Sequence, residues 1–211
     1  HIDPIPFRQV SLPGLERFRQ HILAGDYVRY VGDPIAVVFA EDPYIAEDAA
    51  ELVDADIHQL DPCLDACGPV AEFKPGIPSE AGVIEKGYGD LEDAFARAHR
   101  IISLRLKIGR HSGIPLETRG AIGNYDAARE LIELHGATKA PHRNRTTIAG
   151  LIDQPLDRLH LFECHIGGGF GVRGELYPED VLVCLATREF KRPVKWIEDR
   201  RENLVATNHS R

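Results

Sequence analysis

The sequence lacks methionine altogether and holds only one tryptophan and four cysteines among its 211 residues. Because residue 1 is not an initiator methionine, we expect the chain to be a piece of a longer protein. The cysteines are Cys63, Cys67, Cys164 and Cys184, and they form no Cys-x-x-Cys pair. This spacing disfavours a zinc or iron–sulfur site and predicts reduced thiols with a structural role.

Long apolar runs and a surplus of positive charge are missing as well. The longest apolar runs, such as residues 35–40, are far shorter than the roughly 20 residues that a membrane-spanning helix needs. No charged and then apolar signal segment opens the chain. The 33 acidic residues outnumber the 25 basic ones, which gives a net charge of −8 and disfavours binding to nucleic acid or anionic membranes. We therefore expect a soluble, acidic, cytoplasmic protein.

The short motifs of several enzyme classes are also absent. The sequence has no Gly-x-Ser-x-Gly, no histidine–carboxylate spacing of a zinc protease, and no Gly-Lys-Ser or Gly-Lys-Thr of a P-loop. These absences leave hydrolysis and P-loop nucleotide binding without support.

What the sequence does contain is a glycine loop, Gly-Gly-Gly-Phe-Gly-Val-Arg-Gly, at residues 167–174. An apolar run at 159–166 predicts a mostly buried strand before it. Residues 177–191 predict a helix, with a proline near its start and acidic residues in its first turn, and 193–197 predict a second strand. Glycines allow sharp turns and bring backbone N–H groups close to a bound molecule, so this order indicates a ligand-binding loop.

Besides a plain connecting turn, the residues of the loop allow a dinucleotide-binding module. Gly169-x-Gly171-x-x-Gly174 satisfies the pattern for NAD or FAD, and Glu198 or Asp199 could hold a ribose. The acidic pair lies further along the chain than the roughly 20 residues expected after the motif. This alternative therefore predicts a doubly wound parallel sheet but rests on a weak match.

The first third of the chain forms one regular block. Residues 28–40 and 56–60 predict strands on either side of an acidic helix at 43–53. Residues 61–89 carry nine prolines and glycines, too many for a long element, and indicate a connection between two domains.

A second regular block begins at residue 90. Asp90 can cap a helix at 90–98, and residues 101–108 alternate apolar and polar side chains like a strand. Residues 121–135 suggest a hairpin, and 146–152 a short helix. The mixture of helices and strands predicts an α+β fold.

Five separated segments carry a resemblance that covers nearly the whole chain. They are Tyr-Val-Gly-Asp-Pro-Ile-Ala-Val-Val at 30–38, Pro-Leu-Glu-Thr-Arg-Gly at 115–120, Gly-Gly-Gly-Phe-Gly-Val-Arg-Gly-Glu-Leu-Tyr-Pro-Glu-Asp at 167–180, Arg-Pro-Val-Lys-Trp-Ile-Glu-Asp-Arg-Arg-Glu-Asn at 192–203, and Ala-Thr-Asn-His at 206–209. In this order they resemble the molybdenum-binding large subunit of the xanthine dehydrogenase and aerobic carbon monoxide dehydrogenase family, the molybdenum hydroxylases.

The resemblance implies a division into two domains. Residues 1–69 would form a partial α/β hammerhead domain, 70–89 a linker, and 90–211 the N-terminal part of a molybdopterin-binding domain. The family's large subunits are several times longer, and the glutamate that acts as their base lies beyond Arg211. We therefore expect this chain to be inactive by itself.

The resemblance also implies a site. It assigns catalytic roles to His111 and Phe170 and cofactor contacts to Gly168, Gly169, Phe170, Gly171 and Arg173. Phe170 would lie beside the oxygen ligands of the metal, and His111 stands where many relatives carry a glutamine that hydrogen-bonds one of them. Because the pterin holds the molybdenum, no protein ligand to a metal is expected.

By the same resemblance, the function is that of an oxidoreductase that hydroxylates an aldehyde, a heteroaromatic compound or carbon monoxide with oxygen from water. The cofactor would be molybdopterin in its cytosine dinucleotide form, and electrons would leave through iron–sulfur clusters and FAD on partner subunits. A purine substrate is disfavoured, because Gly174 stands where purine-oxidising relatives carry a glutamate. An inactive remnant or scaffold of the family is the non-enzymatic alternative.

Overall fold

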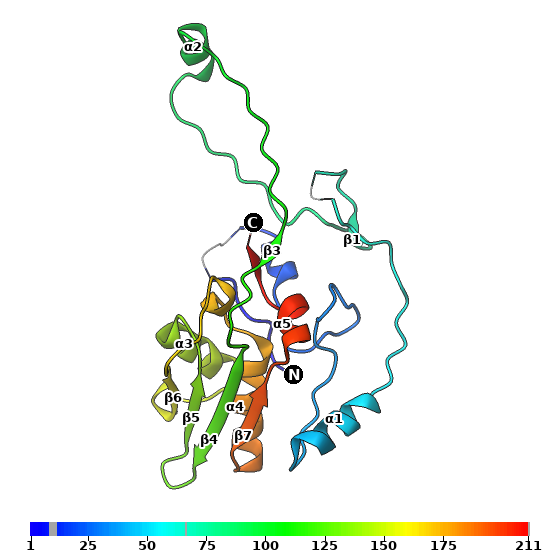
Figure 1. Ribbon diagram of the computed structural model, residues 1–211, viewed down its shortest axis with the longest axis vertical. Coiled ribbons are helices and arrows are strands. Elements are labelled where there is room, and N and C mark those ends of the chain that lie inside the picture. Colours follow the sequence, from blue (N-terminus) through cyan, green and yellow to red (C-terminus); the bar gives the residue numbers. More distant parts are fainter. Residues whose placement is uncertain (9–11, 66, 211) are drawn as a thin grey trace.

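The computed structural model describes residues 1–8, 12–65 and 67–210 (Figure 1). Its helices are η1 (Leu15–Phe18), α1 (Pro43–Glu51), α2 (Leu91–Ala96), α3 (Pro141–Leu151), η2 (Leu156–Arg158), η3 (Val172–Gly174), α4 (Pro178–Phe190) and α5 (Arg200–Ala206), where η marks a 3-10 helix. Its strands are β1 (Glu72–Lys74), β2 (Ile77–Pro78), β3 (His111–Ser112), β4 (Gly120–Asp126), β5 (Leu131–Gly136), β6 (Leu159–Phe162), β7 (Val194–Ile197) and β8 (His209–Ser210).

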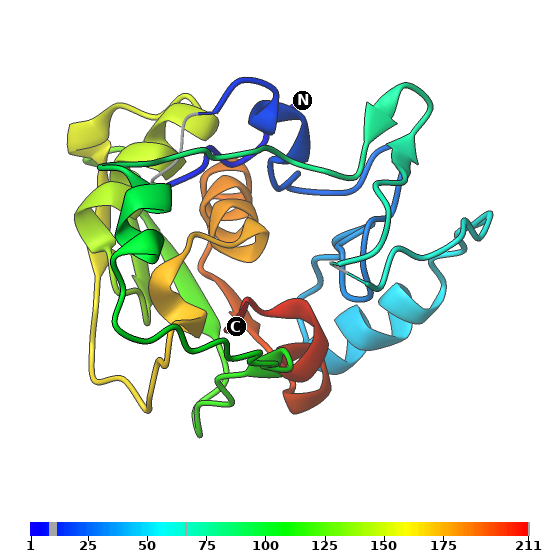
Figure 2. The same cartoon turned by 90° about the horizontal axis from the view of Figure 1, so that it is seen from above.

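A four-stranded mixed sheet in the order β6-β5-β4-β7 forms the body of the molecule. Strand β4 is antiparallel to both β5 and β7, whereas β5 and β6 are parallel. Helix α4 packs across β4, β5 and β7, and α3 packs beside it against β6. Figure 2 shows α4 near the centre, with the N-terminal segment, α3 and α5 around it.

The hydrophobic core lies between this sheet and α4. Ile132, Leu159 and Val181 are completely buried there. Gly123, in the middle of β4, lets the helix come close, because a Cβ atom at this position would lie 2.2 Å from the Thr187 Oγ1 of α4. Helix α4 is thus held close to the middle of the sheet.

Most of the regular elements predicted around the loop are confirmed. The order strand, glycine loop, helix, strand is present as β6, residues 167–174, α4 and β7, and the predicted hairpin is β4–β5. Helix α4 begins with Pro178 at its first position, and α2 is capped by the Asp90 carboxylate, which accepts from the Asp93 N–H. Helix α3 begins at Pro141, five residues before the predicted start at 146.

Three predicted strands are wrong. Residues 28–40, 56–60 and 101–108 form no strand in the described part of the chain, and 28–40 is interrupted by a turn at 31–32. In Figure 1, α2 and the chain that runs from it to β3 extend away from the sheet. Leu104 and Leu106 there are 79% and 76% exposed. An alternating pattern forms a strand only where a neighbouring strand can pair with it and one face can be buried.

The strand predicted at 159–166 is correct only in its first half. Strand β6 ends at Phe162, where its pairing with β5 stops, and Cys164 and Ile166 beyond it are exposed. The chain therefore leaves the sheet earlier than its apolar pattern indicates.

Residues 28–40 pack against α4 and α5 instead of forming a strand. Gly32 at φ 96° leaves no room for a side chain, because a Cβ atom there would lie 2.8 Å from the Cβ of Ala206 in α5. Further on, the Phe39 ring meets the Phe190 ring edge to face at 5.4 Å. The two halves of the chain are thus in direct contact.

The sheet topology contradicts the dinucleotide-binding alternative. That alternative needs adjacent parallel strands joined through the helix that follows the loop. Here β6 and β7 lie at opposite edges of the sheet with an antiparallel hairpin between them. The loop also runs into η3, and α4 begins only at Pro178.

Candidate functional site

The glycine loop has an unusual backbone. Gly168 and Gly171 have φ values of 108° and 93°, which favour glycine, and Phe170 between them has φ 46°. A bulky residue in this left-handed region is strained by roughly 1–2 kcal/mol. The Phe170 side chain is nevertheless 72% exposed, so its burial does not offset the strain. Strained backbone with an exposed aromatic side chain is typical of functional loops.

The loop presents unpaired hydrogen-bond donors. Within the residues that the structure describes, the four consecutive amide N–H groups of 168–171 have no hydrogen-bond partner. Cβ atoms built on Gly169 and Gly171 would meet nothing within 4 Å. Successive N–H groups in such a turn form a concave cradle for oxygen atoms or anions. Space is open beside Gly169 and Gly171, whereas a Cβ atom on Gly168 would lie 3.0 Å from the Phe170 ring and 3.2 Å from Pro115.

The side chains of Glu117 and Arg173 support the loop through hydrogen bonds. The Glu117 Oε2 atom accepts hydrogen bonds from the Gly167 N–H at 2.7 Å and from Arg173 Nη2 at 2.9 Å. Arg173 Nε also donates to the Gly168 carbonyl at 2.8 Å, and the Arg173 side chain is only 2% exposed. Since its donors face the protein, Arg173 is placed to shape the loop. Its predicted contact with a cofactor stays a prediction.

A buried ionic cluster lies next to this support. Arg119 Nη2 donates to Glu198 at 2.6 Å, and its Nη1 donates to Glu179 at 3.2 Å. Burial alone would lower the pKa of Arg119, but the carboxylates of Glu179 and Glu198 outweigh that effect and raise it. The ring of Tyr177 covers the guanidinium, with 3.8 Å between Cζ and the ring centroid. Burial raises the pKa of Tyr177 to about 12, so this phenol stays protonated.

Glu117, Arg119 and Glu198 lie in the segments that carry the family resemblance, but the sequence indicated no role for Glu117 and Arg119. The sequence did place these charged residues beside apolar residues that are expected to be buried. Buried charged side chains are normally paired with an opposite charge, so pairing could have been expected. The pairing partners could not be read from the sequence, because 79 residues separate Arg119 from Glu198.

His111 reaches the neighbourhood of the loop through β3. Strand β3 pairs with β8, and Gly113 just after it lies against the loop: a Cβ atom on Gly113 would be 3.0 Å from the Phe170 carbonyl oxygen. The His111 side chain is exposed, and its Nδ1 lies 3.3 Å from the Gly109 carbonyl oxygen. The structure thus places segment 111–113 beside the loop, while the catalytic roles of His111 and Phe170 stay predictions.

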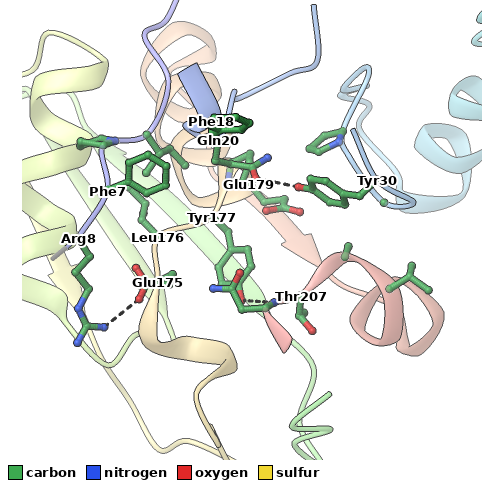
Figure 3. Close-up of a pocket in the computed structure, with 18 of the residues that line it drawn as sticks. Phe7, Arg8, Phe18, Gln20, Tyr30, Glu175, Leu176, Tyr177, Glu179 and Thr207 are labelled. Atoms are coloured by element: carbon green, nitrogen blue, oxygen red, sulfur yellow. Dashed lines mark hydrogen bonds and ion pairs between the residues drawn. The ribbon is translucent and has the colours of Figure 1, made fainter. Parts of the chain in front are cut away.

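A cavity of about 460 Å³ lies between the two halves of the chain (Figure 3). Tyr30 and Gln20 line one side of it and are joined by a hydrogen bond of 2.9 Å. Tyr177 and Glu179 line the other side, so the cavity borders the ionic cluster. The sequence did not indicate this cavity. The predicted site residues are not among those that line it.

Three further observations describe the chain as a whole. Among residues 1–8, 12–65 and 67–210, no three or more His, Cys, Asp and Glu side chains gather where they could hold a metal ion. All four cysteines are free, with Cys184 buried and the other three exposed. No helix in the described part of the chain is long and apolar enough to cross a membrane.

Comparison with known proteins extends these observations. Residues 73–211 match the molybdopterin cofactor-binding domain, and residues 5–61 match the a/b hammerhead domain of aldehyde oxidase and xanthine dehydrogenase. The chain is 40% identical over 200 residues to the 6-hydroxypseudooxynicotine dehydrogenase complex subunit gamma of Paenarthrobacter nicotinovorans, covering 93% of this chain and 25% of that protein. It is 31% identical to the carbon monoxide dehydrogenase large chain of Hydrogenophaga pseudoflava, covering 99% and 28% respectively.

Two solved structures are similar to this chain over most of its length. The quinoline 2-oxidoreductase of Pseudomonas putida 86 superposes with a TM-score of 0.74 at 32% identity, over 92% of this chain and 25% of that one. The carbon monoxide dehydrogenase of Oligotropha carboxidovorans gives 0.69 at 30% identity, over 82% and 24%. The chain therefore spans about a quarter of the length of these relatives. Its α+β fold joins a hammerhead unit to a molybdopterin-binding unit, and the chain belongs to the molybdopterin cofactor-binding domain family of the xanthine dehydrogenase and carbon monoxide dehydrogenase type.

Proposed function

We propose that this chain supplies one wall of a molybdopterin site in a larger oxidoreductase. The observation that carries the proposal is the row of four unpaired amide N–H groups at 168–171, in a loop that Glu117 and Arg173 support and that is open beside Gly169 and Gly171. Oxygen atoms of a pterin cofactor or of its metal fit such a row of donors. The bare backbone of Gly169 allows the close approach that these hydrogen bonds need.

The side chains near the loop have separate proposed roles. Phe170 stands out from the strained turn and would pack against the bound cofactor, excluding water from it. His111 would donate an imidazole N–H to a cofactor oxygen. When bound, the cofactor supplies the oxygen-transfer and redox chemistry, and the protein supplies position and electrostatics.

For the reaction, we propose hydroxylation of an aldehyde, a heteroaromatic compound or carbon monoxide with oxygen from water. The names of the relatives support the heteroaromatic class and carbon monoxide. A purine stays disfavoured, since Gly174 lacks the carboxylate expected for purine binding. The neighbouring Glu175 does not replace it, because its carboxylate is paired with Arg8 at 3.3 Å.

The complete enzyme would need further parts. We propose that the C-terminal remainder of the large subunit supplies the base, and that iron–sulfur and FAD subunits take up the electrons. The cofactor would be the cytosine dinucleotide form of molybdopterin. Four free cysteines in a chain without disulfides fit a reducing compartment, which supports a cytoplasmic location.

Metal and pterin analysis of the full-length subunit, purified within its native complex, tests the proposal. We expect close to one molybdenum and one pterin per large subunit, and a lower content of both in a Phe170→Ala variant that folds normally. Tyr125→Phe, in β4 away from the loop, is a matched control that should keep the wild-type content. An intact complex that contains neither molybdenum nor pterin would refute the proposed function.

A further inference from the structure

Arg119 is held by several hydrogen bonds to one residue, Glu198. Its backbone N–H donates to Glu198 Oε2 at 3.0 Å, its carbonyl accepts from the Glu198 N–H at 3.0 Å, and its Nε donates to Glu198 Oε1 at 2.9 Å. The Asn203 side chain donates to the same carboxylate at 2.8 Å. Both the main chain and the side chain of Arg119 are therefore tied to the end of β7 and to α5.

One route leads from this anchor to the start of the glycine loop. Glu117 precedes Arg119 by two residues, and its carboxylate accepts from the Gly167 N–H and from Arg173. The Glu117 N–H in turn donates to the Gly167 carbonyl at 3.2 Å. Because so short a stretch has little freedom, the position of Arg119 determines where the Glu117 carboxylate lies. The Glu117 carboxylate in turn holds the backbone of Gly167 at the start of the loop.

A second route leads to the end of the loop. The Tyr177 ring rests on the Arg119 guanidinium, and its hydroxyl donates to the Val172 carbonyl at 2.6 Å. The same hydroxyl accepts from the Asn208 N–H at 3.2 Å. Val172 is the first residue of η3, and its own N–H donates to the Gly169 carbonyl at 2.8 Å. The Tyr177 hydroxyl thus stabilises η3, the turn at the end of the loop.

The loop depends on these outside contacts. Its four central N–H groups make no hydrogen bond among the described residues, and its internal backbone bonds are those from Val172 to Gly169 and from Gly174 to Gly171. A cradle of donors binds well only when it is already in place before the ligand arrives, since ordering it at that moment costs binding free energy.

We propose that Arg119 is a positioning residue that holds the glycine loop in its ligand-ready shape, through Glu117 at the start of the loop and Tyr177 at its end. The expected effect of Arg119 on cofactor retention rests on the proposed function. The ordering of the loop itself rests only on contacts within this chain.

Amide hydrogen exchange on the full-length subunit, followed by mass spectrometry, tests the inference. Tyr177→Phe keeps the ring on Arg119 and removes one hydroxyl. We expect exchange at the amides of Val172 and Gly174 to become roughly tenfold faster, the effect of losing one hydrogen bond. Exchange in the β4–β5 hairpin should stay unchanged. Arg119→Lys disturbs both routes and should also speed exchange at Gly167.

Tyr125→Phe is the matched control, because the Tyr125 hydroxyl has no hydrogen-bond partner among the described residues and lies at the far end of β4. The rate at which each variant loses pterin is measured in parallel, and Tyr177→Phe should lose it several-fold faster. Faster loop exchange with unchanged pterin loss would support the positioning role and count against the proposed function. Loop exchange equal to that of the control, or equally faster exchange throughout the sheet, would overturn the positioning role.

Discussion

Replacing Gly169 by alanine separates ligand approach from loop stability. A Cβ atom at this position meets nothing within 4 Å, and Gly169 is not among the glycines with positive φ. We therefore expect the free energy of unfolding to change by no more than about 0.5 kcal/mol. The new methyl group projects beside the unpaired N–H groups, into the space that a cofactor would occupy. Crowding of that contact should cost about 1–3 kcal/mol, or about 5- to 150-fold in cofactor affinity.

Gly167→Ala is the informative contrast in the same loop. Its Cβ atom would lie 2.6 Å from the Glu117 Cβ, so Glu117 must move and weaken its hydrogen bonds to the Gly167 N–H and to Arg173. This change should lower the free energy of unfolding by roughly 1–3 kcal/mol. Gly171→Ala is less useful, because φ 93° adds backbone strain to any effect on the ligand.

The assay measures two quantities on each full-length variant, the urea midpoint of unfolding and the molybdenum and pterin content per subunit. Gly150→Ala, at an exposed glycine of α3 with open space around it, controls for the substitution itself. Gly169→Ala should lose cofactor at a wild-type midpoint, and Gly167→Ala should lose both. A Gly169→Ala subunit with full cofactor content would refute the assignment of this face of the loop.

Two further predictions concern the core under the site. Burial and the neighbouring Glu179 raise the pKa of Asp180 to about 6, so the folded state holds a proton that the unfolded chain releases near pH 4. The contribution of Asp180 to stability should therefore fall as the pH rises from about 4 to about 6. Asp180→Asn should remove this contribution, so a pH dependence of the urea midpoint over that range equal to that of the wild type would refute the reasoning. Gly123→Ala should destabilise by roughly 1–3 kcal/mol, because its Cβ would lie 2.2 Å from Thr187 Oγ1. Adding Thr187→Ala, which removes a buried hydroxyl without a partner, should restore most of that loss in the same assay, and strictly additive losses would contradict the packing argument.

Several local elements and the family could be predicted from the sequence alone. Helix α4 could be predicted because a proline at its start, an acidic first turn and apolar residues at helical spacing all act within one segment. The β4–β5 hairpin and the glycine loop were predictable for the same reason, since their signals are contiguous in the chain. Separated motifs in a fixed order identified the family without any knowledge of the fold.

The contacts between distant segments could be seen only in the tertiary structure. The pattern at 101–108 is that of a strand, yet its apolar side chains are exposed, because pairing depends on a partner that a periodic pattern does not specify. The contact of Glu117 with Gly167 and that of Arg119 with Glu198 join residues 50 and 79 positions apart. Such contacts follow from the sheet order and from the close approach of α4 at Gly123, which are properties of the whole packed domain. A ligand-binding role of the loop is therefore a prediction from the sequence, and only the fold could reveal how Glu117, Arg119 and Tyr177 contact it.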